Sequence, residues 1–156
     1  MSTRATVRGG AWPAVAVLAG LAVLVQLYGL YRVTGPPSPP WFPHADKLEH
    51  ALGFALPVVL CLLAAGLRAR SRGAEPSGRA LAVVTGVFAV HAVVSELVQH
   101  LLYRSRTGDP LDVLADGAGV VVGAAAASWL LRRGRSRAAD GTGTGTEARR
   151  TPSAVR

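Results

Sequence analysis

The chain has 156 residues, enough for one domain, and 50% of them are hydrophobic. The hydrophobic residues fall into four long runs, which excludes a small soluble domain built from short amphipathic elements. The formal charge is +8, but the basic residues lie in the segments between the runs and form no stripe on a helix face. This distribution excludes a nucleic-acid-binding protein, and no nucleic-acid partner is expected.

The first apolar run covers residues 11–31 and contains no charged side chain; a basic tail, residues 1–10, precedes it. At a rise of about 1.5 Å per residue, a helix of this length reaches about 30 Å, the thickness of the hydrocarbon core of a bilayer. A cleaved signal peptide would have a shorter apolar region and a small-residue cleavage site, whereas this run ends in Tyr28, Tyr31 and Arg32. We therefore interpret it as an uncleaved transmembrane helix.

Three further apolar runs follow, separated by short polar connections, over residues 48–67, 80–103 and 111–131. Residues 134–156 are basic and then rich in Gly and Thr, a composition that predicts a disordered tail. The predicted fold class is an all-α membrane protein, a bundle of four transmembrane helices within residues 11–133.

The positions of the basic residues predict the orientation of the bundle. Ten of them lie in the amino-terminal tail, the second connection and the start of the carboxyl-terminal tail, against four in the first and third connections. The positive-inside rule then places both termini in the cytoplasm. We expect a multi-pass protein of the plasma membrane.

Acidic residues gather at the opposite, extracytoplasmic end. Six of the nine lie in the outer connections or in the outer part of a span, namely Asp46, Glu49, Glu96, Asp109, Asp112 and Asp116. A charged side chain that faces lipid is costly, so Glu96 and Asp116 should face the interior of the bundle. Helical rise places Glu96 about 10 Å and Asp116 roughly 8 Å from the outer ends of their spans, which allows the two to lie at similar depth.

Helical spacing brings several of these side chains onto shared faces. Asp46 and His50 are four residues apart, and Glu96 and Gln99 are three apart, so each pair lies on one face of its helix. Lys47 is the only lysine of the chain, and a compact ammonium suits contact with a phosphate. We expect these residues to contribute to one polar site.

A continuous stripe of the fourth span carries Asp112, Asp116, Gly119 and Gly123. The Gly-x-x-x-Gly spacing lets the backbone of another helix approach closely, which would turn the two carboxylates inward. The same face permits a homo-oligomer.

These residues resemble the pattern of the VanZ-like family, which is named for an accessory protein of resistance to the glycopeptide teicoplanin. The resemblance covers residues 43–123, with matches at Asp46-Lys47-x-x-His50, Glu96-x-x-Gln99, Arg106, Asp112, Gly119 and Gly123. The family pattern has Asn at the position of Asp116, and an amide can donate a hydrogen bond where a carboxylate cannot unless it is protonated. The resemblance implies a four-span membrane protein linked to the cell envelope or to glycopeptide tolerance, and it implies no established reaction.

The first functional hypothesis is a non-enzymatic envelope protein that binds an anionic lipid-linked or glycopeptide-type ligand in an extracytoplasmic pocket. Its partner would be a membrane lipid or a lipid-linked molecule. Lys47 and Arg106 would hold an anionic group, while other side chains would bind a polar part. The candidate ligand-binding residues are Asp46, Lys47, His50, Glu96, Gln99, Arg106, Asp112 and Asp116.

The alternative is a membrane enzyme that acts on a lipid-phosphate or cell-wall precursor, with Glu96 or His50 as general base. No known catalytic signature supports it. No His-Glu-x-x-His motif or cysteine pair is present, so we expect no metal site, and we expect no cofactor. Transport would require an oligomer, since four spans are few for a carrier. A purely structural interpretation also remains, in which Glu96 and Asp116 pair with other polar groups and hold the helices together.

Overall fold

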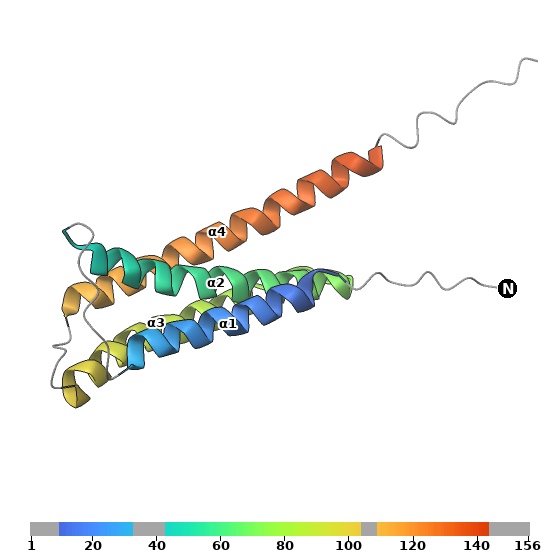
Figure 1. The fold of residues 1–156 in the computed structure, drawn as a ribbon. Coiled ribbons are helices and arrows are strands. Elements are labelled where there is room, and N and C mark those ends of the chain that lie inside the picture. Colours follow the sequence, from blue (N-terminus) through green and yellow to red (C-terminus); the bar gives the residue numbers. More distant parts are fainter. Residues whose placement is uncertain (1–9, 33–42, 104–108, 144–156) are drawn as a thin grey trace, which may run out of the picture.

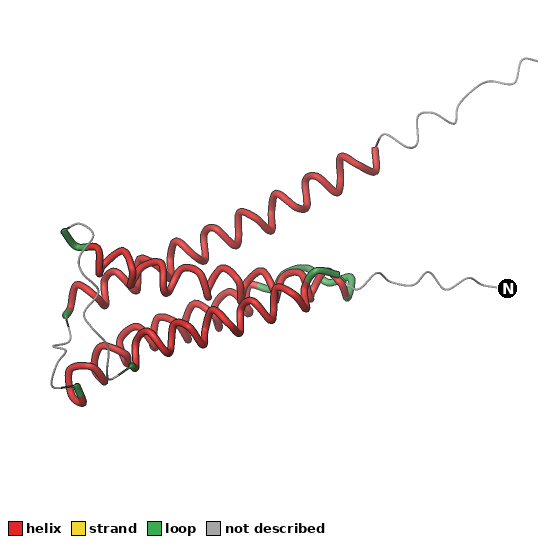
Figure 2. Tube along the Cα trace, in the orientation of Figure 1, coloured by secondary structure: helices red, strands yellow, loops and turns green. Residues whose placement is uncertain are grey.

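The computed structural model describes residues 10–32, 43–103 and 109–143, with side chains up to residue 135. This part of the chain is helical and contains no strand (Figure 2). Its elements are α1 (Trp12–Tyr31), α2 (Ala45–Ser71), α3 (Gly78–Leu102) and α4 (Pro110–Gly143) (Figure 1). Each helix is long and apolar enough to cross a membrane. The predicted four-helix fold class is confirmed, and the chain is a multi-pass membrane protein.

α2 and α4 extend furthest beyond their expected spans, whereas α3 begins only two residues early. α2 begins at Ala45 instead of residue 48 and therefore includes Asp46 and Lys47. α4 continues to Gly143, through the first ten residues of the segment that we expected to be disordered from residue 134 onward. Alanine and arginine, both strong helix formers, make up six of the eight residues 132–139, so the helix can propagate past the apolar run.

α2 contacts each of the other three helices. A narrow apolar core lies along it and consists of Leu30, Phe54, Val58, Leu62, Phe88, Ala92, Val120 and Ala127. Phe54 and Phe88 meet edge to face with their ring centroids 6.3 Å apart, a favoured aromatic geometry. Many large apolar side chains remain exposed, such as Val25 and Leu102, each with an exposed fraction of 71%. An apolar surface of this extent suits contact with lipid acyl chains.

α2 and α4 approach each other closely at two glycines. A Cβ atom at Gly123 would lie 2.6 Å from the carbonyl oxygen of Ala55, and a Cβ atom at Gly119 would overlap the carbonyl oxygen of Ala51. Only glycine permits this approach, as the Gly-x-x-x-Gly spacing predicted. The glycine face is therefore covered by α2 of the same chain, and a contact between copies would need another surface. Beyond this crossing, the carboxyl-terminal part of α4 extends away from the other helices (Figure 1).

Candidate functional site

Polar side chains from three helices meet at one end of the bundle. α2 and α4 begin at this end and α3 finishes there, so the first turns of two helices face the last turns of the third (Figure 1). We call these side chains the carboxylate cluster and define it as Asp46, Lys47, His50, Glu96, Asp109, Asp112 and Asp116.

Lys47 lies among three carboxylates. Its Nζ atom donates to Asp109 Oδ2 at 2.6 Å and to Asp112 Oδ1 at 2.5 Å, and it lies 3.0 Å from Asp46 Oδ2. An ammonium has three N–H donors, and these contacts occupy all of them. The hydrogen bond from Lys47 also lowers the pKa of the Asp109 carboxyl below its ordinary value. The charge of Lys47 is thus compensated within the protein.

His50 joins α2 to both α3 and α4. Its Nδ1 shares a hydrogen bond of 2.9 Å with Asp116 Oδ1 and lies 4.0 Å from Glu96 Oε1. Its other ring nitrogen, Nε2, lies 3.8 Å from Asp112 Oδ2. The imidazole therefore contacts a carboxylate on each side, and its orientation is fixed by α4.

Glu96 and Asp116 are buried, with exposed fractions of 5% and 0%. Both lie inside the bundle beside His50, and helical rise predicted a similar depth for Glu96 and Asp116. Glu96 Oε2 accepts a hydrogen bond of 3.2 Å from the backbone N–H of Asp109. Among residues 10–32, 43–103 and 109–143, no donor lies within hydrogen-bonding distance of Glu96 Oε1 or Asp116 Oδ2. Buried polar atoms without a partner are rare, and these two remain available to a ligand.

The other predicted site residues are distributed differently. Gln99 turns towards α1, where its Nε2 donates to the carbonyl oxygen of Leu30 at 3.3 Å. Asp46 contacts Lys47, but its side chain is 60% exposed. Arg106 lies outside the described residues. His91, which is not a predicted site residue, shares a hydrogen bond of 3.2 Å with the Tyr31 hydroxyl.

Asp109 is the member of the cluster that sequence reasoning missed as a site residue. An aspartate before a proline is typical of a turn, and Asp109 does cap one, since its Oδ1 accepts from the backbone N–H of Leu111 at 2.9 Å. It also binds Lys47 with Oδ2 and Glu96 with its backbone N–H. The available signal was the spacing of three residues between Asp109, which immediately precedes α4, and Asp112 in its first turn, because this spacing can bring both carboxylates to one side of the helix.

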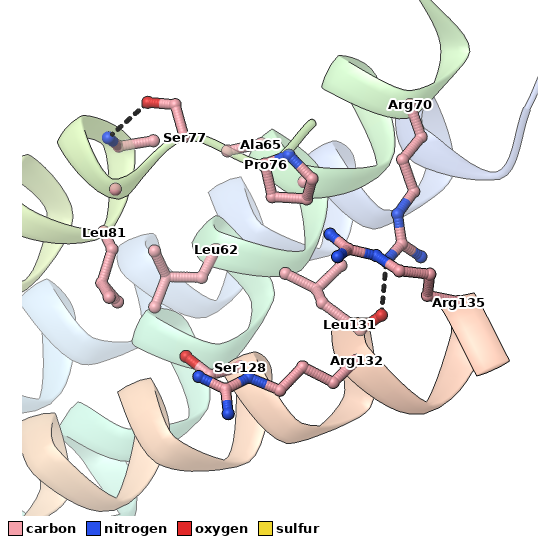
Figure 3. Close-up of a pocket in the computed structure, with 13 residues that line it drawn as sticks. Leu62, Ala65, Arg70, Pro76, Ser77, Leu81, Ser128, Leu131, Arg132 and Arg135 are labelled. Atoms are coloured by element: carbon pink, nitrogen blue, oxygen red, sulfur yellow. Dashed lines mark hydrogen bonds between the residues drawn. The ribbon is translucent and has the colours of Figure 1, made fainter. Parts of the chain in front are cut away.

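A cavity of about 180 Å³ lies at the other end of the bundle, between α2, the start of α3 and α4 (Figure 3). Three arginines line it, Arg70, Arg132 and Arg135. Arg70 donates to the carbonyl oxygen of Leu131, and Arg135 pairs with Glu75. The two ends of the bundle therefore differ in charge, with carboxylates at one end and arginines at the other.

Comparisons of the chain with protein-family models, with curated proteins and with solved structures give no match.

Proposed function

We propose that the chain is a VanZ-like integral membrane protein of the cell envelope. In this proposal both termini face the cytoplasm, and the carboxylate cluster lies on the extracytoplasmic side of the plasma membrane. The cluster binds a lipid-linked or glycopeptide-type ligand, and this binding contributes to envelope integrity or glycopeptide tolerance. The arginines around the cavity at the opposite end support this orientation, because basic residues are enriched on the cytoplasmic side.

The observation that carries the proposal is that side chains from three separate segments meet. His50 and Glu96 match the family pattern, and Asp116 stands where that pattern has Asn. His50, Glu96 and Asp116 come from three segments, and His50 and Asp116 are 66 residues apart in the chain. One ligand-capable atom of each lies within 4.8 Å of the others. Ionisable residues buried in a membrane bundle mark functional sites by default, and here they converge at one end of it.

The contacts of Lys47 change which groups a ligand can use. Because three carboxylates occupy the ammonium, the cluster presents acceptor oxygens, chiefly Glu96 Oε1 and Asp116 Oδ2. These atoms suit the N–H groups of a glycopeptide or the hydroxyl groups of a glycosylated lipid.

Binding to the purified full-length protein in lipid nanodiscs tests this function. Teicoplanin and a polyprenyl-phosphate lipid serve as probes, and calorimetry gives their dissociation constants. We expect saturable binding of one probe by the wild type and binding at least about tenfold weaker for Glu96→Gln, because loss of one charge-assisted hydrogen bond costs about 1.5–3 kcal/mol.

Glu49→Gln is the matched control, since Glu49 lies on α2 but is exposed to solvent or lipid headgroups. The Glu49→Gln variant loses one negative charge, as Glu96→Gln does, and should bind the probe with the affinity of the wild type. Equal affinity of the wild type and Glu96→Gln would remove the cluster from ligand binding, and failure of both probes to bind would reject the ligand class.

One observation favours the enzymatic alternative. Asp116 holds the His50 imidazole through Nδ1, which is how a carboxylate orients a histidine general base, and Glu96 Oε1 lies beside the ring. Release of phosphate from a polyprenyl-phosphate substrate, lost in both His50→Gln and Glu96→Gln, would favour an enzyme over a binding protein.

A further inference from the structure

We propose that His50, Glu96 and Asp116 together bind one divalent transition-metal cation, Mn²⁺ or Zn²⁺, inside the bundle. The inference deepens the proposed function, because the cation would occupy the same cluster as the envelope ligand. It rests on the proposed function through this shared site. The sequence predicted no metal site because the familiar motifs place two ligands on one helix. Here each ligand comes from a different helix, α2, α3 or α4, and only the fold brings the three together.

The positions of the ligand atoms fit one shared ion. Atoms bound to one cation at about 2.0–2.2 Å stand roughly 3–3.5 Å from one another. His50 Nδ1 and Asp116 Oδ1 are already 2.9 Å apart, and His50 Nδ1 and Glu96 Oε1 are 4.0 Å apart. All three ligand atoms lie within 4.8 Å of one another, so the Glu96 side chain would rotate towards the other two when the ion binds. Binding would replace the proton between His50 and Asp116 with the metal ion.

Two buried carboxylates, each with one oxygen that has no hydrogen-bond donor, favour the binding of a cation. Glu96 Oε1 and Asp116 Oδ2 lie in side chains that are more than nine-tenths buried, and no donor of the described residues reaches them. A buried carboxylate is costly unless it is paired or coordinates a metal. Lys47 does not neutralise the carboxylates of Glu96 and Asp116, because its three contacts are with other carboxylates.

Asp112 completes the environment that a histidine ligand requires. A metal-bound histidine donates its second ring N–H to a carboxylate or carbonyl, which fixes the ring and its tautomer. With Nδ1 on the metal, the proton resides on Nε2, and Nε2 lies 3.8 Å from Asp112 Oδ2. A small shift would bring the two atoms into hydrogen-bonding distance and make Asp112 a positioning residue, and its carboxylate is held in turn by Lys47.

The donor set indicates the class of metal. One imidazole nitrogen and two carboxylate oxygens suit Zn²⁺ or Mn²⁺, whereas Mg²⁺ and Ca²⁺ prefer oxygen ligands alone. Three protein ligands leave at least one coordination position open, as in metal sites that bind substrates. An anionic phosphate or carboxylate of a ligand could take that position. The cation would thus explain how a site rich in carboxylates accepts an anionic molecule.

The test measures metal without any envelope ligand, so the metal site and the proposed function can fail separately. Full-length protein that carries no polyhistidine tag is stripped with a chelator in nanodiscs and titrated with Zn²⁺ or Mn²⁺. Calorimetry gives the affinity, and elemental mass spectrometry after gel filtration gives the stoichiometry. We expect one ion per chain. Affinity should be at least about 100-fold weaker in Glu96→Gln and Asp116→Asn, and about 10–100-fold weaker in Asp112→Asn.

Glu49→Gln, which removes an exposed carboxylate from the same helix as His50, should bind the ion like the wild type. Circular dichroism and gel filtration show that each variant is folded, and Asp112→Asn keeps the test informative if a ligand variant does not fold. Less than one ion per ten chains would overturn the proposal. Equal affinity in all variants would overturn it as well, because the ion would then be bound elsewhere.

Discussion

Gly119→Val should disrupt the packing of α2 on α4 and lower the free energy of unfolding by about 3 kcal/mol or more. A Cβ atom at this position would overlap the backbone carbonyl of Ala51, which cannot move aside as a flexible side chain can. The two helices would have to separate or rotate. Gly119 lies three residues after Asp116, and Ala51 follows His50, so a shift here also moves the site. We expect ligand and metal binding to weaken together with stability.

Gly117→Val in the same helix is the matched control. A Cβ atom at Gly117 meets no atom within 4 Å, so this variant carries the same loss of glycine and the same β-branched side chain without the overlap. Unfolding in mixed detergent micelles, followed by circular dichroism as the denaturing detergent increases, compares the two. A similar loss of stability in both variants, or none in Gly119→Val, would contradict the close packing of α2 and α4.

Hydropathy predicted the four helices because each apolar run is long enough to span a bilayer, but it did not predict where they end. The first turn of α2 contains Asp46 and Lys47, and α4 continues past Arg135. Apolar composition marks the part of a helix that lies in lipid. The helix itself continues wherever the backbone can go on forming hydrogen bonds, and polar residues with good helix propensity allow that.

Spacing within each helix predicted that His50, Glu96 and Asp116 could meet, because depth and face follow from the period of the helix. It could not predict the partners of Lys47, since those depend on how α2 and α4 are rotated against each other. The same limit applies to Gln99. It shares a face with Glu96 at a spacing of three residues, yet its amide donates to the carbonyl oxygen of Leu30 in α1.

Lys47→Met should lower the free energy of unfolding by about 2 kcal/mol at pH 7. The substitution keeps a long unbranched side chain but leaves Asp109 and Asp112 close together without a cation, and Asp112 is largely buried, with 14% of its side chain exposed. Arg79→Met also removes one positive charge, from an exposed position at the start of α3, and should change stability by less than about 0.5 kcal/mol. Detergent-induced unfolding of the three proteins measures the difference.

A double variant and a pH series show whether the effect comes from the carboxylates. Lys47→Met/Asp112→Asn should be more stable than Lys47→Met alone, because it relieves the repulsion between like charges.

The hydrogen bond from Lys47 lowers the pKa of Asp109 from its ordinary value of 3.8, so this pairing stabilises the fold fully above that value. As the pH falls through the lowered pKa of the folded protein, Asp109 is protonated in the folded protein too and the contribution disappears. The stability difference between wild type and Lys47→Met should therefore shrink below about pH 4. A difference that stays constant down to pH 3 would mean that Lys47 stabilises the helices through its aliphatic chain and that its charge is dispensable.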